Sequence, residues 1–94
     1  MIRNVVLMKL RPDHDPAKLA EIQRRLRSLD CPGTLAYSVG TDAGLKEGSW
    51  GLAIVADFVD DDAYLAYDAD EEHNRIRADI APLVESVARA QFRL

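Results

Sequence analysis

The sequence predicts an α+β fold with the element order β-α-β-β-α-β. Short apolar stretches with alternating residues indicate strands, two stretches with apolar residues at helical spacing indicate helices, and turns rich in glycine or proline separate them. The chain has 94 residues, which suits one domain and leaves no room for a second core. We therefore expect residues 1–94 to form a single domain.

The first strand is expected over residues 2–10, where β-branched and long aliphatic residues dominate and both faces are largely apolar. A helix should follow, because Asp15 is a good N-cap and Pro16 suits the first helical position. Its apolar stripe consists of Leu19, Ile22, Leu26 and Leu29.

Two alternating strands are expected next, over residues 34–41 and 50–58. The connecting segment between them contains two glycines, which favours an antiparallel hairpin with a long loop. In the second helical region, Asp60 can cap a short helix and Asp70 a second one, until Pro82 disturbs the helical pattern. Residues 86–94 should close the chain as a strand.

This order is the ferredoxin-like arrangement, a four-stranded antiparallel sheet with the helices on one face. Helices on one face leave the other face open, and we expect that open face to carry Val6, Met8 and Leu10. An open apolar face of this size predicts an interface. A two-fold homodimer, in which two sheets meet and enclose a barrel, is the simplest solution.

Composition and charge exclude several classes of protein. The net charge of −4 argues against nucleic acid as the main partner. The apolar run at the N-terminus is too short to span a bilayer, and no signal-peptide cleavage site follows it, so no membrane association is expected. The single cysteine, Cys31, fits a reducing cytoplasm. The basic residues between Lys18 and Arg27 are expected to be a solvated helix face more than an anion site.

Four segments in order resemble a known family: "MIRNVVLMKL", "PGTLAYSVGTD", "GLAIVADFVDDDAYLAY" and "EEHNRIRADIAPLVESVARAQF". The chain is similar over nearly its full length to the stress-responsive dimeric α+β barrel family, usually shortened to Dabb. The resemblance implies a ferredoxin-like homodimer with a pocket between the sheet and helices of each subunit. It does not imply one activity.

Some members of this family, including a plant polyketide cyclase, act without a metal or organic cofactor. Their pocket carries a histidine on the first strand, a tyrosine at the end of the short helix, and a histidine six residues beyond it. By resemblance, the tyrosine corresponds to Tyr67 and the second histidine to His73, whereas the first-strand histidine is replaced by Asn4. Asparagine can hold a carbonyl or hydroxyl group but cannot transfer a proton near neutral pH.

The expected ligand-binding residues are therefore Asn4, Val6, Tyr67 and His73, with His73 and Tyr67 as candidate catalytic residues. His73 could act as a general base with Tyr67 as acid or orienting donor, or it could simply be a first-turn residue of a helix capped by Asp70. Asn4 could contact a ligand, or make a structural hydrogen bond. No cofactor is expected, and no metal, because the acidic residues Asp60, Asp61 and Asp62 point in different directions on a helix.

Three functions remain open from the sequence. The chain could bind a small apolar or aromatic ligand and serve in a stress response. It could be a cofactor-independent cyclase, isomerase or oxygenase, or it could be a structural stress protein without a ligand. The replacement of histidine by Asn4 weakens the second reading, while Tyr67 and His73 count against the third.

Overall fold

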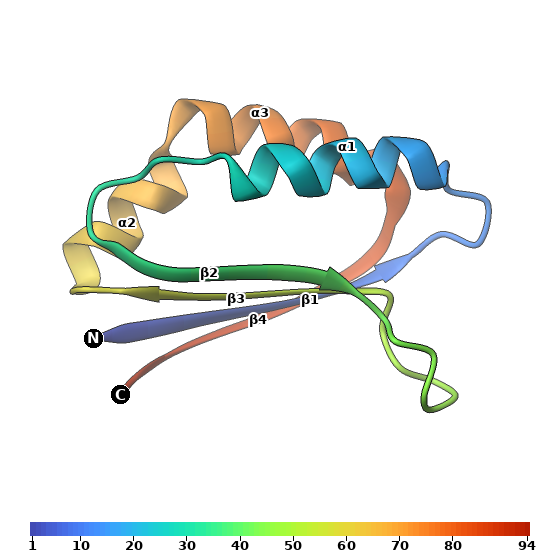
Figure 1. Ribbon diagram of the computed structural model, residues 1–94, viewed down its shortest axis with the longest axis horizontal. Coiled ribbons are helices and arrows are strands. Elements are labelled where there is room, and N and C mark those ends of the chain that lie inside the picture. Colours follow the sequence, from blue (N-terminus) through green and yellow to red (C-terminus); the bar gives the residue numbers. More distant parts are fainter.

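The computed structural model describes residues 1–94 and has the predicted element order, with a four-stranded antiparallel sheet in the strand order β2-β3-β1-β4. All helices lie on one face of the sheet (Figure 1). The elements in chain order are β1 (Ile2–Leu10), α1 (Pro16–Arg27), β2 (Thr34–Thr41), β3 (Leu52–Phe58), α2 (Asp61–Ala69), α3 (Glu71–Ile80), the 3₁₀ helix η1 (Ala81–Leu83) and β4 (Val84–Arg93). The ferredoxin-like prediction is confirmed.

Three aspartates start the helices as the sequence predicts. Asp15, Asp60 and Asp70 each accept a hydrogen bond from a backbone N–H of the first turn, at the starts of α1, α2 and α3. The strand limits differ slightly from expectation. β3 begins at Leu52 and not at residue 50, and one hydrogen bond, from the Asp42 N–H to the Gly51 carbonyl, continues the β2–β3 pairing into the loop. β4 begins at Val84, immediately after the 3₁₀ turn that contains Pro82.

The predicted orientation of β1 is wrong. Val6 and Met8 lie under the helices, in one cluster with the apolar stripe of α1 and with residues of α3, and Leu10 packs against that cluster. The alternation of a strand that is apolar on both sides defines two faces but does not say which one the helices cover. In the β1–β3 register, Val6 lies opposite Ile54 and Met8 opposite Leu52, and both of these partners are buried in the same core.

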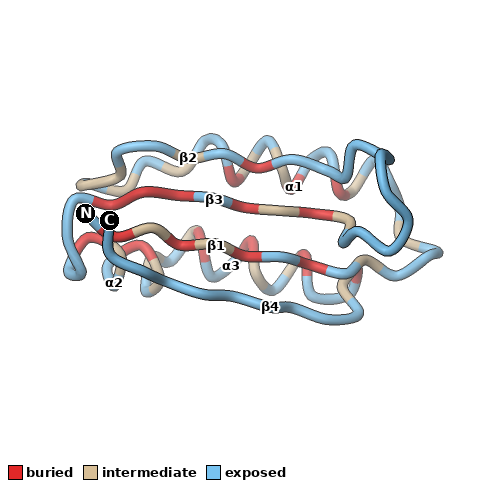
Figure 2. The backbone as a smooth tube through the Cα atoms, turned by 90° about the horizontal axis from the view of Figure 1, so that it is seen from below, coloured by how far each residue is buried: buried red, intermediate tan, exposed pale blue.

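The face that the helices leave open carries the alternate residues of each strand, and Figure 2 views the molecule from this side. Leu7 is 40% exposed, Val55 36% and Phe92 47%. Arg3 and Asp57, paired across β1 and β3, form a two-pronged ion pair among them, with N–O distances of 2.7 and 2.8 Å. An open apolar face is therefore present as predicted, but its members are the neighbours in sequence of those expected.

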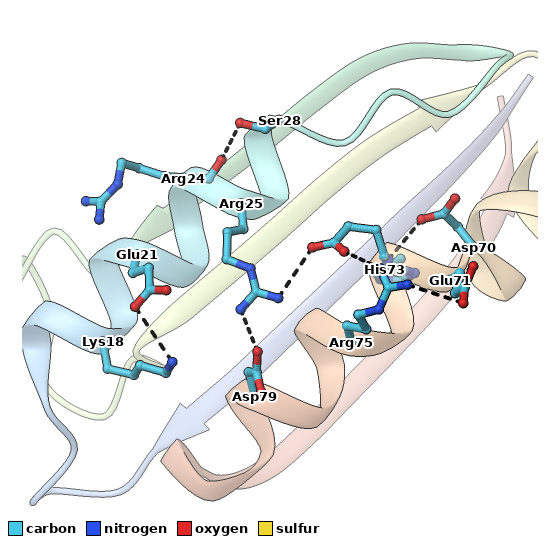
Figure 3. Close-up of polar contacts among 11 residues, drawn as sticks. Lys18, Glu21, Arg24, Arg25, Ser28, Asp70, Glu71, His73, Arg75 and Asp79 are labelled. Atoms are coloured by element: carbon cyan, nitrogen blue, oxygen red, sulfur yellow. Dashed lines mark hydrogen bonds and ion pairs between the residues drawn. The ribbon is translucent and has the colours of Figure 1, made fainter.

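The basic stretch of α1 is less free than the sequence indicates. Arg25 extends from α1 to α3 and bonds Asp79 at 2.6 Å and Glu72 at 3.4 Å (Figure 3). Lys18 forms an ion pair with Glu21 on its own helix. The stretch thus holds two helices together, and Arg25 is not simply a solvated side chain. None of the helices is long and apolar enough to cross a membrane.

Candidate functional site

A cavity of about 170 Å³ lies between the sheet and the second helical region. Its inner walls are apolar side chains from β1, β3, α1 and α3, and its polar residues gather at two places. The lining residues are Asn4, Val6, Met8, Leu26, Ile54, Tyr64, Tyr67, Asp68, His73, Ile76, Arg77, Ile80 and Arg89. All four residues expected to bind a ligand, Asn4, Val6, Tyr67 and His73, therefore line one cavity.

His73 is fixed by the junction between α2 and α3. Its backbone N–H donates to Asp70, the N-cap of α3, at 2.9 Å (Figure 3). Its ring Nδ1 lies 2.9 Å from the carbonyl oxygen of Tyr67, the third residue from the end of α2. The helix start and the placement of the ring are therefore one arrangement. His73 is a first-turn residue that also lines the cavity, and its role as a general base stays a prediction.

The ring of His73 presents a free acceptor to the cavity. A carbonyl oxygen can only accept, so Nδ1 carries the proton and donates it to Tyr67, which leaves a lone pair on Nε2. Burial, with Arg77 as a second cause, lowers the pKa of His73 and keeps the imidazole neutral at pH 7. No fully buried side-chain nitrogen or oxygen lacks a hydrogen-bond partner, so the unpartnered Nε2 must reach the cavity space.

Tyr67 stacks on His73 and makes one hydrogen bond through its hydroxyl. The two rings stack with centroids 4.0 Å apart, and the Tyr67 hydroxyl lies 2.8 Å from the hydroxyl of Tyr37 on β2. Burial raises the pKa of Tyr67, and the neighbouring Tyr37 adds to this effect, so its hydroxyl stays protonated near neutral pH. Tyr67 therefore contacts His73 by stacking, and its hydroxyl, with one hydrogen bond to Tyr37, can still make another. Its role as an acid or orienting donor toward a ligand stays a prediction.

Asn4 makes a structural hydrogen bond through its oxygen, while its NH₂ group has no partner in the protein. It is buried on β1, and its Oδ1 accepts from the Nε2 of Gln91, the residue opposite it on β4, at 2.8 Å. It does not hydrogen-bond His73. Since no fully buried polar atom is left unpaired, the Asn4 amide NH₂ also reaches the cavity space. We call the two buried polar lining residues, Asn4 and His73, the inner end of the cavity; it offers one donor, Asn4 Nδ2, and one acceptor, His73 Nε2.

The second group of polar residues forms the cavity mouth, which we define as Tyr64, Asp68, Arg77 and Arg89. These lining residues are only partly buried, or exposed in the case of Arg89. Arg77 bonds the side chain and the carbonyl oxygen of Asp68. The mouth therefore faces solvent at the junction of α2, α3 and β4.

Comparison with protein families assigns the chain. The family described as "Stress responsive A/B Barrel Domain", Dabb, matches residues 2–93. The chain belongs to the Dabb family. We found no match among curated proteins.

Solved structures agree with this Dabb fold. A dimeric ferredoxin-like protein of unknown function from Thermobifida fusca is 28% identical, with a TM-score of 0.89 over 99% of this chain and 90% of that chain. A hydroxynitrile lyase from Passiflora edulis is 14% identical, with a TM-score of 0.82 over 97% and 90% of the two chains. The cofactor-independent oxygenase SnoaB from Streptomyces nogalater, crystallised as a mutant, is 13% identical, with a TM-score of 0.72 over 99% and 91%. At 14% and 13% identity, the last two comparisons support the fold of this Dabb protein and not its activity.

Sequence reasoning missed several residues of the Dabb cavity. Arg77 follows His73 by four residues on α3, a helical spacing that could have placed it beside the histidine. Tyr37 does not line the cavity but bonds the Tyr67 hydroxyl, and it shares a strand face with buried Val39. No local sequence pattern indicates that Arg89 lines the cavity, because only the β1–β4 register, which places it opposite Val6, brings it there.

Other candidates considered from the sequence lie apart from the cavity. His14 bonds a backbone carbonyl in the exposed loop before α1. Cys31 is half-buried, and burial raises the pKa of its thiol. No group of three or more histidine, cysteine, aspartate or glutamate residues is arranged to hold a metal ion.

Proposed function

We propose that this Dabb protein is a homodimer that binds a small aromatic molecule bearing an oxygen substituent, one molecule in the cavity of each subunit. The observation that carries the proposal is a pair of polar atoms without a partner in the protein, Asn4 Nδ2 and His73 Nε2, on two buried residues at the inner end of a cavity lined mostly by apolar residues. Such atoms need a partner from water or a ligand. A hydroxyl group could accept from Asn4 and donate to His73 at the same time.

The size of the cavity limits the ligand to one ring. An apolar cavity of about 150 Å³ is known to hold benzene, and this cavity measures about 170 Å³. Larger ligands usually need about 300 Å³ or more. A phenol therefore fits both the volume and the donor and acceptor at the inner end.

The homodimer rests on the open sheet face. Leu7, Val55 and Phe92 leave apolar surface in contact with water that a second copy would cover. The similar proteins from Thermobifida fusca and Bacteroides fragilis are both described as dimeric. A two-fold contact between these faces leaves the cavity free, because the cavity lies on the opposite side of the sheet.

Phenol tests the binding proposal directly. In protein labelled with ¹⁵N-histidine, phenol should shift the Nε2 resonance of His73 with saturation, because the lone pair of that nitrogen accepts the phenol hydroxyl. His14, the only other histidine, lies in an exposed loop and serves as the internal control. Unchanged spectra at high phenol concentration, or equal shifts at both histidines, would refute specific binding in the cavity.

A second candidate function is a cofactor-independent enzyme with His73 as the general base. It is favoured by one observation, the neutral imidazole whose Nε2 is free while Nδ1 is anchored on a carbonyl. Two proteins of similar fold are named as a hydroxynitrile lyase and a cofactor-independent oxygenase. Against it stands Asn4, which offers no second base.

Proton exchange tests this second function. If His73 removes a proton next to a carbonyl group, the protein should catalyse deuterium uptake from D₂O into phenylacetone, and His73→Gln should abolish the catalysis. If the wild-type protein takes deuterium into phenylacetone no faster than buffer alone, His73 is not a general base for this type of substrate.

A further inference from the structure

Arg89 is the one charged side chain of the cavity without a charged partner. The cavity has two guanidinium groups and one carboxylate, and that carboxylate, Asp68, pairs with Arg77. No carboxylate lies within ion-pair distance of Arg89 on the edge strand β4. Arg89 therefore lines the cavity mouth without an ion-pair partner.

The charge of the cavity runs against that of the whole chain. With His73 neutral, two guanidinium groups and one carboxylate leave one net positive charge, while the chain as a whole carries −4. A positive cavity on an acidic protein favours a negatively charged ligand. The guanidinium group suits one kind of partner especially well, because its planar donors match the two oxygens of a carboxylate.

The geometry of β4 relates Arg89 to the inner end of the cavity. Gln91, which holds Asn4, and Arg89 lie on the same face of the strand, two residues apart. Two residues of antiparallel strand span about 6.8 Å. A single ring with polar groups at its two opposite ends bridges a distance of this order.

We infer that the natural ligand is an aromatic carboxylate, whose acid group pairs with Arg89 at the mouth while an oxygen at the far side of the ring meets Asn4 and His73. This inference rests on the proposed binding function and specifies its ligand class. Val6 and Ile54, opposite each other on β1 and β3, line the cavity and supply apolar surface for the ring.

Two probes of equal size separate the inference from the binding function. 4-Hydroxybenzoate carries the acid, and 4-hydroxybenzamide replaces it with a neutral amide. Water screens an ion pair at an exposed side chain such as Arg89, so the gain in affinity is only severalfold. Calorimetric titration of the wild-type protein should therefore show about three- to fivefold tighter binding of the acid.

The variant Arg89→Gln should bind both probes with the affinity that the wild-type protein has for the amide. Its retained amide affinity shows that the cavity is intact. The matched control is Arg93→Gln, which removes an arginine from the same face of the same strand but outside the cavity, and it should keep the preference.

The possible results distinguish a failure of the inferred ligand class from a failure of the binding function. Equal affinities in the wild-type protein, or a preference that survives Arg89→Gln, would overturn the aromatic carboxylate while leaving the binding function in place. Failure of both probes to bind would count against the binding function itself, and with it the inference.

Discussion

Replacing Leu7 by aspartate should separate the proposed dimer without unfolding the subunit. Leu7 points to the open face of the sheet and is 40% exposed in the single chain. A carboxylate there remains hydrated in a monomer, so the subunit should stay folded. In a face-to-face dimer, the same carboxylate would be removed from water without a partner.

The loss can be sized from the exposed fraction. Full burial of a leucine side chain contributes about 1.5–3 kcal/mol. The 40% of Leu7 that a partner can still cover is therefore worth about 0.6–1.2 kcal/mol per subunit, or about 1.2–2.4 kcal/mol for two copies. That alone raises the dimer dissociation constant about 7- to 50-fold, and the cost of desolvating two carboxylates adds to it.

Sedimentation velocity across a concentration series measures this change. The matched control is Leu65→Asp, the same substitution at an exposed position on α2, on the other side of the molecule. It should leave the dimer unchanged. Met8→Asp, one residue further along β1, should instead unfold the subunit because Met8 lies in the core. A Leu7→Asp protein that sediments as the wild-type dimer would refute the assignment of the open face as the interface.

Three further predictions concern the cavity. Asp70→Ala should lower the free energy of unfolding by about 1 kcal/mol in urea unfolding. It should also weaken phenol binding, because Asp70 holds the backbone of His73. The control Asp15→Ala removes the N-cap of α1 and should lower the free energy of unfolding by a similar amount, but leave phenol binding unchanged. Burial lowers the pKa of His73, so the folded state takes up its proton at lower pH than the unfolded chain, whose histidine titrates near pH 6.5. The associated stability is complete above about pH 6.5 and falls as pH drops toward the folded pKa, so the wild-type protein should lose more stability than His73→Gln between about pH 7 and pH 5; parallel losses would contradict this. Tyr37→Phe removes the partner of the buried Tyr67 hydroxyl and should cost about 1–3 kcal/mol in urea unfolding, whereas an unchanged midpoint would mean that water replaces it.

Much of the fold follows from local patterns in the sequence. The N-caps Asp15, Asp60 and Asp70 and the alternation in the strands each depend on interactions within a few residues, and the structure has them as expected. The same local logic placed His73 in the first turn of α3. Its distance from Tyr67 is six residues, short enough for the helix junction alone to bring the two rings together.

The wrong or missing predictions depend on contacts between residues far apart in the sequence, which no local pattern reveals. Which side of β1 the helices cover depends on the packing of distant elements, so Val6 and Met8 were assigned to the wrong face. The partner of Asn4 is Gln91, which is 87 residues away. Arg89 reaches the cavity for the same reason, through the pairing of the first and last strands.

The most direct test of the account is to locate a bound ring within the protein. Nuclear Overhauser effects should connect the ring protons of phenol with the methyl groups of Val6 and the ring of His73, because both line the same cavity of about 170 Å³. Contacts only with exposed side chains such as Leu45, in the β2–β3 loop, would contradict the central claim that this cavity is a binding site.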